Sequence, residues 1–392
     1  MAKARKPAVK GQSKPKAKAA AKKPLSRPKP AATAPPKARP AVPKGKVPAA
    51  PAAAAKAAPP KAPPPVAKPA AAPSRPGRSP AAGSPALTPA HTARRSGPQL
   101  PAGLAGTVRY DEPLAKHTTF RIGGPARVLF APATVEAVAA AVAWARAQGL
   151  PWIVLGMGSN VLVRDTGFPG LVIKMGKGLD EVVVKGATWT VGAGVPTPVL
   201  ARRSAEAGLE GLQRLIGVPG SVGGGVFMNS GAHGQDYAGV LVSAPVLTPK
   251  GEVKSLPRQA IRFGYRTSGL EGHVVLGAVL RLEEEDPARL KADMAMVLKR
   301  RRAGTPFDQP CAGSMFRNPK EMTAGRLIDR CGLKGRRVGG AMISPLHANY
   351  FVNKGGATAD DVLKLIDIAR TAVFKEYGHE LALEVKVIGA AK

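Results

Sequence analysis

The spacing of hydrophobic and polar residues changes at about Leu104, after which hydrophobic runs alternate with segments of helical period. Residues 127–130 and 152–155 are predicted strands. Residues 134–148 are a predicted helix between them, with Thr134 as its N-cap and Gly149 as its stop. This order predicts one βαβ unit.

The centre of the chain carries shorter hydrophobic runs, which predict an α+β segment with a mostly antiparallel sheet. The predicted strands are residues 171–174, 181–185, 188–191, 240–247, 252–255 and 274–283, with a helix at residues 197–207. Three more helices are predicted at residues 287–302, 323–331 and 358–377. Residues 337–342 and 350–352 are predicted strands of a smaller α/β unit.

The first 100 residues have a different composition, with no Asp or Glu, 22 Lys and Arg, and 23 Pro. They offer little apolar surface to offset the entropy of ordering, so residues 1–103 are predicted to be a disordered Lys/Ala/Pro-rich tail. The formal net charge is +34 for the whole chain but +12 for residues 101–392, which is typical of a moderately basic enzyme. Two interpretations of the tail stay open: weak binding to polyanions, or a solvated spacer.

Several classes of protein are disfavoured by what the sequence lacks. No run of about 18 apolar residues occurs, and the tail has no signal-peptide core, so we expect no membrane span and a cytoplasmic chain. The two cysteines, Cys311 and Cys331, are too few for a disulfide scaffold, and no metal site is predicted. The length of the chain after the first 100 residues predicts two or three domains. The oligomeric state stays open.

A first glycine-rich segment, Leu155-Gly-Met-Gly-Ser-Asn160, follows a predicted strand. Glycines allow backbone amides to approach an anion closely, and the Ser159 and Asn160 side chains add hydrogen-bond donors, so a pyrophosphate would fit. The segment lacks the third glycine of the Rossmann fingerprint, and a strand-like run follows it instead of a helix. An ordinary tight turn is the alternative.

The second segment, Gly217-Val-Pro-Gly-Ser-Val-Gly-Gly-Gly225, has five glycines in nine residues. Each glycine costs roughly 0.5–1 kcal/mol relative to alanine inside a helix or strand, so we expect a loop whose backbone contacts a ligand. A flexible linker is the alternative. Neither segment ends in the Gly-Lys-Ser/Thr of a P-loop, which argues against nucleotide hydrolysis.

Three side chains are candidates for chemistry. Ser314 lies in a Gly-flanked turn, Arg266 ends the run Phe263-Gly-Tyr-Arg266, and Glu384 is the one acid of the apolar segment 381–389, a predicted strand. A hydroxyl, a guanidinium and a carboxylate can deliver a proton beside an anionic substrate. Taken singly, each could instead be a turn cap, a structural ion pair or an exposed strand residue.

The order of these segments resembles the UDP-N-acetylenolpyruvoylglucosamine reductase family. The matching motifs, all between residues 104 and 390, are His117-Thr-Thr-Phe-Arg-Ile-Gly-Gly-Pro-Ala126, Leu155-Gly-Met-Gly-Ser-Asn160, Val218-Pro-Gly-Ser-Val-Gly-Gly224, Phe263-Gly-Tyr-Arg266, Gly313-Ser314, His347-Ala-Asn349 and residues 381–389. Only 47 residues separate Arg266 from Ser314, which resembles the shorter, type II subclass.

The resemblance implies an α+β fold with a FAD-binding domain of the PCMH/vanillyl-alcohol-oxidase type in two subdomains, residues 104–286. A smaller α/β substrate domain at residues 287–379 and a C-terminal strand at residues 380–392 that returns to the active site would follow. The implied cofactors are FAD and NADPH, and the implied reaction reduces the enolpyruvyl ether of UDP-N-acetylglucosamine to UDP-N-acetylmuramate in peptidoglycan precursor synthesis. The alternative is another FAD-dependent oxidoreductase of this fold, acting on small alcohols or sugars.

The resemblance also implies roles for single residues. Ser314 would donate the proton, delivered after hydride transfer from flavin N5, with Arg266 and Glu384 as the other catalytic residues. FAD contacts are expected for Gly156, Gly158, Ser159, Asn160, Gly220, Ser221, Gly223 and Gly224, and UDP-sugar contacts for Asn318, Lys334, His347 and Lys386.

Three positions depart from the family pattern. Gly304 stands where a lysine is usual, so Arg301 or Arg302 would have to supply the charge for a phosphate. Lys386 stands where an arginine is common and keeps the charge without the bidentate geometry. His233 stands where a tyrosine is frequent, which leaves flavin stacking at this position open.

Overall fold

The computed structural model describes residues 97–390, and the expectations for residues 1–96 lie outside this range. The packed part begins earlier than residue 104. Leu100 is 8 % exposed and packs against the first hydrophobic core. Its backbone N–H donates a hydrogen bond to Tyr110 Oη at 3.1 Å.

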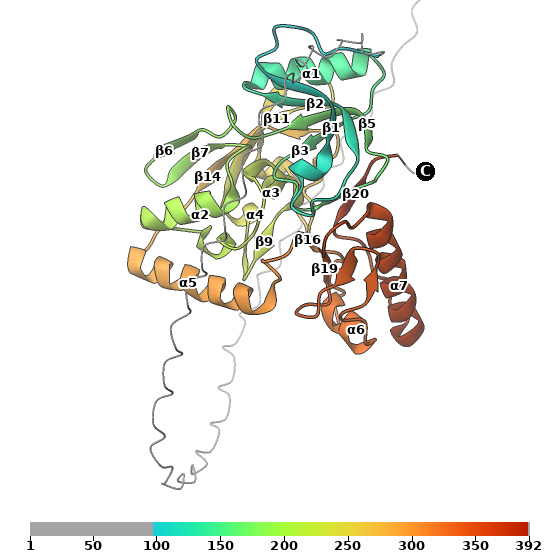
Figure 1. The fold of residues 1–392 in the computed structure, drawn as a ribbon. Helices are drawn as coiled ribbons and strands as arrows, with labels where there is room; N and C mark the ends of the chain where they lie inside the picture. Colours follow the sequence, from blue (N-terminus) through green and yellow to red (C-terminus); the bar gives the residue numbers. More distant parts are fainter. Residues whose placement is uncertain (1–96, 391–392) are drawn as a thin grey trace, which may run out of the picture. The chain divides into compact units, whose positions relative to one another are not determined.

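The first sheet has the strand order β1-β2-β5-β3 (Figure 1). Its strands are β1 (Gly106–Pro113), β2 (Pro125–Pro132), β3 (Trp152–Leu155) and β5 (Phe168–Lys174), and α1 (Val135–Ala147) packs on it. The Thr134 hydroxyl accepts from the N–H of Ala137, which confirms the predicted N-cap. The predicted βαβ unit is present, but β5 lies between β2 and β3, so these two strands do not pair directly.

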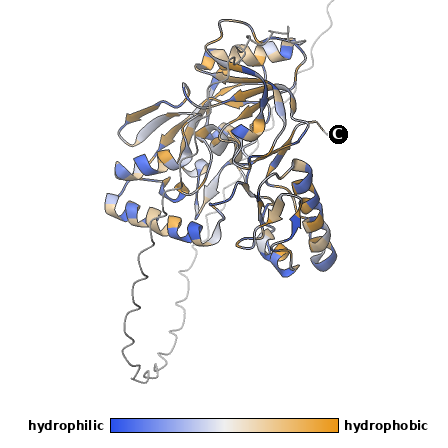
Figure 2. Cartoon of the chain, viewed as in Figure 1, coloured by the Kyte–Doolittle hydropathy of each residue, from blue (hydrophilic) through white to orange (hydrophobic). Residues whose placement is uncertain are grey.

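The second sheet is antiparallel throughout, with the order β12-β11-β14-β7-β6 and β13 paired to β11. The strands are β6 (Val182–Lys185), β7 (Thr188–Gly192), β11 (Leu241–Leu247), β12 (Val253–Pro257), β13 (Val274–Val275) and β14 (Gly277–Arg281). In Figure 2 the strands are mainly hydrophobic, whereas α2 (Thr197–Glu206) and α5 (Pro287–Gly304) mix hydrophobic and hydrophilic residues. The mostly antiparallel sheet predicted for the centre of the chain is confirmed.

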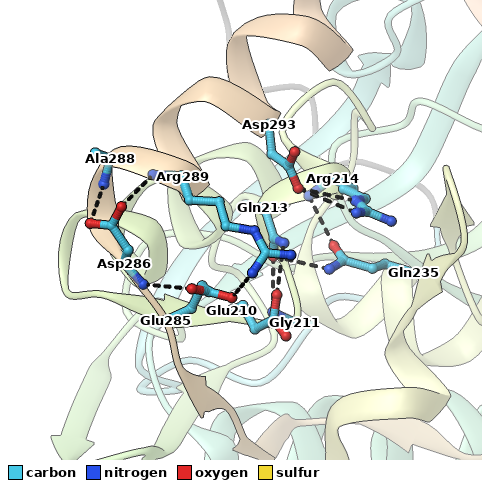
Figure 3. Close-up of polar contacts among 10 residues, drawn as sticks. All are labelled: Glu210, Gly211, Gln213, Arg214, Gln235, Glu285, Asp286, Ala288, Arg289 and Asp293. Atoms are coloured by element: carbon cyan, nitrogen blue, oxygen red, sulfur yellow. Dashed lines mark hydrogen bonds and ion pairs between the residues drawn. The ribbon is translucent and has the colours of Figure 1, made fainter.

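Helix α5 packs with the second sheet, although residue 287 was the expected start of the substrate domain. Leu290, Met294 and Val297 belong to the same hydrophobic core as Trp189 on β7. Figure 3 shows Asp293 of α5 paired with Arg214 of η2 (Gln213–Leu215), at 3.3 Å. The packing therefore divides the chain near residue 304.

The C-terminal α/β unit, defined here as residues 305–385, contains a four-stranded antiparallel sheet of order β16-β19-β18-β17 (orange to red in Figure 1). Its elements are β16 (Cys311–Ser314), α6 (Ala324–Arg330), β17 (Arg337–Val338), β18 (Ala341–Ile343), β19 (Tyr350–Asn353) and α7 (Ala359–Tyr377). Phe316, Phe351 and Ile366 lie in its core. Phe120 and Ile122 lie there too, so the segment after β1 is part of this core.

The last strand is shorter than predicted. β20 covers only Lys386–Ile388 and pairs in parallel with β4 (Val161–Val163). Glu384 precedes β20, and its N–H donates to the carbonyl of Met315 at 2.8 Å. The residues before β20 bond to the segment after β16 instead of to β4, and Leu383 forms an isolated antiparallel bridge with Phe316.

Short elements complete the described chain: η1 (Leu114–His117), β8 (Leu209–Glu210), α3 (Val222–Met228), β9 (Gly231–Ala232), β10 (Gln235–Asp236), α4 (Tyr237–Val240), η3 (Arg258–Ala260) and β15 (Glu283–Glu284). Within residues 97–390, no helix has both the length and the hydrophobicity needed to cross a membrane.

Candidate active site

A cavity of about 680 Å³ is lined by three groups of residues that are far apart in the sequence. The first glycine-rich turn supplies residues 156–160, and the second glycine-rich segment supplies residues 218–221 and 223–225. Arg266, Ser314 and Glu384 line the same space. Its volume is within the range of small-molecule and cofactor sites.

The first glycine-rich turn is fixed by its contacts with the protein. Gly158 has φ +67°, and a Cβ there would collide with the carbonyl oxygen of His117. A Cβ at Gly156 would collide with Ser221 Oγ, and Ser159 Oγ donates to the carbonyl of Pro219 at 3.1 Å. The two glycine-rich segments therefore form one continuous wall.

Lys174, at the end of β5, supports this wall from behind. Its Nζ donates a hydrogen bond to the carbonyl of Gly156. Burial lowers the pKa of the Lys174 ammonium, because the charged form loses its hydration. The lysine therefore fixes the direction of one peptide group in the turn.

The second glycine-rich segment contains the start of a helix, so the prediction of a loop without regular structure was wrong for its second half. Helix α3 begins at Val222, after Ser221. A Cβ at Gly223 would lie 2.8 Å from the Ala193 side chain, and one at Gly225 would overlap the buried ring of Tyr237. Close packing around these glycines offsets their cost of roughly 0.5–1 kcal/mol each in a helix.

Gly224 is different from its two neighbours. It is exposed and lines the cavity, and the nearest atom to a Cβ built there is Ser221 Oγ at 3.8 Å. Protein packing therefore does not require a glycine here, whereas a ligand that lies against the backbone would. A bound cofactor such as FAD fits this cradle.

The three candidate catalytic residues meet at one cavity. Arg266 Nε donates to Glu384 Oε1 at 2.7 Å, and Arg266 Nη2 donates to the carbonyl of Gly231 at 3.1 Å. Arg266 has φ +56°, and the buried Asn229 fixes the turn before it by donating to the carbonyl of Gly264 at 3.2 Å. Ser314 reaches the cavity from the end of β16.

Of the four predicted substrate contacts, Lys386 lines the cavity and the other three do not. The carboxamide oxygen of Asn318 accepts from the N–H of Ala324 at 3.1 Å, and Lys334 pairs with Asp329 at 2.8 Å. His347 Nδ1 accepts from the N–H of Asn349 at 3.2 Å, and burial lowers the His347 pKa. Their contact with substrate stays a prediction.

The departures at residues 304 and 233 have clear structural settings. Arg301 lines the cavity, whereas Gly304 and Arg302 do not. The Nε of Arg301 is buried without a hydrogen-bond partner, so it is available to an anion. His233 is also absent from the cavity lining, and its carbonyl accepts from Arg214 Nη1 at 3.3 Å.

Three aromatic residues that sequence reasoning missed as site residues also line the cavity: Trp152 on β3, Phe227 on α3 and Tyr350 on β19. Tyr350 lies opposite Ser314 in the β16–β19 ladder. Its place directly after the His347-Ala-Asn349 motif was the available signal. No pattern marks Phe227, because it reads as an ordinary core residue.

The two sheets and the glycine-rich cavity wall define a mixed helix-and-sheet FAD-binding protein of the PCMH type. Residues 126–256 match a family model described as FAD binding domain. Residues 305–388 match the model described as UDP-N-acetylenolpyruvoylglucosamine reductase, C-terminal domain. The second match begins where the packing divides the chain.

Known proteins narrow this class to one family. The chain is 44 % identical to the UDP-N-acetylenolpyruvoylglucosamine reductase of Bacillus velezensis over 287 residues, 72 % of this chain and 95 % of that protein. The enzyme of the same name from Bacillus subtilis has the same identity and coverage. The crystal structure of the reductase from Thermus caldophilus superposes with a TM-score of 0.63 at 38 % identity, over 72 % of this chain and 99 % of that chain.

The chain therefore belongs to the UDP-N-acetylenolpyruvoylglucosamine reductase family. The resemblance and the fold class drawn from the sequence are confirmed, and the alternative of another FAD-dependent oxidoreductase of this fold, acting on small alcohols or sugars, is not favoured.

Proposed function

We propose that this chain is an NADPH-dependent flavoenzyme that reduces the enolpyruvyl ether of UDP-N-acetylglucosamine to UDP-N-acetylmuramate. The family supports the reaction in peptidoglycan precursor synthesis. One observation carries the proposal for this chain: Arg266, Glu384 and Ser314 line the same cavity as the two glycine-rich segments. An acid, a cation and a cofactor cradle are thereby brought to one substrate.

FAD, when bound, supplies a hydride from its N5 to the substrate double bond after reduction by NADPH. Its contacts are assigned to Gly156, Gly158, Ser159, Asn160, Gly220, Ser221, Gly223 and Gly224, all of which line the cavity. The open backbone at Gly224 supports close approach of the cofactor. The buried, unpartnered Nε of Arg301 is assigned to a phosphate.

Arg266 stabilises the negative charge that develops on the substrate carboxylate. One N–H of its guanidinium serves Glu384 and another serves the carbonyl of Gly231, and the remaining donors are free to bind an incoming carboxylate. The two existing bonds hold the guanidinium in place, so little reorganisation is needed when the charge appears. Lys386 adds a further cation to the cavity lining, besides Arg266 and Arg301.

Ser314 transfers its hydroxyl proton to the substrate carbon beside the one that accepts the hydride. A serine hydroxyl is a weak acid, so the carbon must be strongly basic and the serine must recover a proton from solvent afterwards. Glu384 holds the Arg266 guanidinium through the 2.7 Å ion pair and so orients it toward the carboxylate of the substrate.

Two half-reactions measured without oxygen test the proposal. NADPH should bleach the absorbance of the flavin in the full-length protein, and the UDP-sugar enolpyruvyl ether should then restore it. UDP-N-acetylglucosamine without the enolpyruvyl group is the control and should leave the flavin reduced. A colourless protein, or a flavin that the ether does not reoxidise, would overturn the proposal.

A further inference from the structure

Asp165, in the loop after β4, contacts the start of α7, although Ala359 lies 194 positions later in the chain. Asp165 Oδ1 accepts from the N–H of Ala359 at 2.9 Å, and Oδ2 accepts from the N–H of Asp360 at 3.1 Å. The first turn of a helix leaves N–H groups without partners inside the helix, and a carboxylate there also interacts favourably with the helix dipole. One side chain thus links β4 to the C-terminal α/β unit.

Helix α7 does not need Asp165 in order to begin. Thr358 Oγ1 accepts from the N–H of Asp361 at 3.1 Å, and the Asp361 carboxylate accepts from the N–H of Thr358 at 3.0 Å. This is a complete capping box within the helix's own segment. The two bonds to Asp165 are therefore additional, and they join two separate parts of the chain.

The segment that carries Asp165 also reaches the cavity. At its first residue, Asn160 Nδ2 donates to the carbonyl of Glu384 at 3.2 Å, and Asn160 lines the cavity. In its middle, β4 pairs with β20. Residues 160–165 therefore hold Glu384 at one end and α7 at the other.

Helix α7 in turn supports the sheet that carries Ser314. Val362 and Ile366 on α7 are buried in one core with Met315 and Phe316, the two residues after Ser314. Because packed cores transmit displacement, a shift of α7 shifts the end of β16. The bond from Glu384 to Met315 already fixes Glu384 beside Ser314, so the contact between Asp165 and α7, together with Leu162 of β4 in the same core, sets where both residues lie relative to the glycine-rich wall of the cavity.

We propose that Asp165 is a positioning residue, which fixes the C-terminal α/β unit so that Ser314 and Glu384 face Arg266 and the glycine-rich wall across the same substrate. The expected change in the rate of flavin reoxidation rests on the proposed function. The expected change in the structure of α7 and β16 rests on the geometry alone. Asp165 does not line the cavity, so its role is exerted through α7.

The test substitutes Asp165→Asn, which keeps the size but turns one of the two acceptors into a donor that faces a backbone N–H. Flavin content and the rate of flavin reduction by NADPH should stay near wild type. Reoxidation by the UDP-sugar ether should slow by about 10- to 100-fold, as expected when reacting groups are misplaced by a fraction of an ångström to 1 Å. Asp165→Glu keeps both acceptor oxygens on a longer side chain, so its rate of flavin reoxidation should lie between those of the wild type and Asp165→Asn.

Thr358→Ala is the matched control, because it weakens the start of the same helix without touching the link to Asp165. It should lower the melting temperature and leave both half-reactions unchanged. If Asp165→Asn gives this same profile, Asp165 is only a helix cap and the proposal is wrong. Loss of flavin from Asp165→Asn would also overturn it, since the effect would then fall on the cofactor.

Hydrogen exchange of the FAD-bound protein gives a readout that does not depend on the reaction. Asp165→Asn should speed amide exchange in the first turn of α7 and also along β16, whereas Thr358→Ala should affect the first turn alone. Unchanged exchange along β16 would contradict the proposed link. If wild-type flavin is not reoxidised by the ether, the proposed function fails while the exchange result still decides the role of Asp165.

Discussion

The cofactor side and the substrate side of the cavity differ in how directly the sequence identifies them. All eight residues predicted to contact FAD line the cavity, but only Lys386 of the four predicted substrate contacts does so. Glycine-rich segments make contacts through the backbone, and the residue type itself reveals where the backbone must be open or must turn. Asn318, Lys334 and His347 depend on side-chain direction, which spacing along the chain does not determine.

The cofactor side also contains an internal contrast, between glycines that the fold requires and one that it does not. Gly223 and Gly225 pack against Ala193 and Tyr237, whereas Gly224 between them has open space beside it. Neighbouring glycines in one run therefore differ: packing requires Gly223 and Gly225, whereas Gly224 between them is open toward the cavity.

The largest expected effect comes from separating these two roles with valine. Gly225→Val should destabilise the protein by about 2–3 kcal/mol, because the side chain overlaps the ring of Tyr237. Gly224→Val should keep a folded protein with little change in melting temperature and lose its flavin. Thermal unfolding and flavin absorbance of the two purified variants check this, and a yellow Gly224→Val protein would remove the distinction.

The sequence predicted the regular elements well, because their signals are local. Thr134 caps its helix as predicted, and the hydrophobic alternation located the central antiparallel sheet. The glycine-rich start of α3 was misread, since the low propensity of glycine is overridden by its contact with the Tyr237 ring. Local patterns contain no information on such a contact.

Long-range partners explain the remaining differences. The periodicity of α5 shows that one face is buried, but not that Leu290 packs with Trp189 of the second sheet. The pair of Arg266 and Glu384, 118 residues apart, was accessible through the family resemblance. Asp165 carried no signal, because a single acid after a strand is common and its partner lies 194 residues later.

On the substrate side, Ser314→Ala should have the strongest selective effect. Flavin content and reduction by NADPH should stay near wild type, because the hydroxyl acts only on the substrate. Reoxidation by the UDP-sugar ether should slow by roughly 10²–10⁴, the range for a positioned general acid. Stopped-flow absorbance separates the two steps, and slower flavin reduction would assign Ser314 to the cofactor side instead.

Substitutions in the Arg266–Glu384 pair should slow flavin reoxidation less than Ser314→Ala does. Arg266→Lys loses the planar geometry that serves Glu384 and Gly231 together, and Glu384→Gln loses the charge of the 2.7 Å ion pair. Both variants should slow reoxidation by roughly 10- to 100-fold and keep their flavin. Variants that purify without flavin would place the pair on the cofactor side and remove the asymmetry between the two sides.

The smallest effect on turnover is expected from removal of the basic N-terminal segment. A chain that begins at residue 97 keeps Leu100 in the first core and retains every residue that lines the cavity, so turnover should match that of the full chain. Removal of the segment should abolish any binding to polyanions, and such binding by the full chain should weaken steeply with salt, because counterions are released on association. Turnover assays and a salt-titrated heparin column on both chains measure the two effects.

A chain that starts at residue 104 is the matched control. It lacks Leu100, so its melting temperature should fall. Lower turnover in the chain that starts at residue 97 would instead show that the basic segment contributes to catalysis.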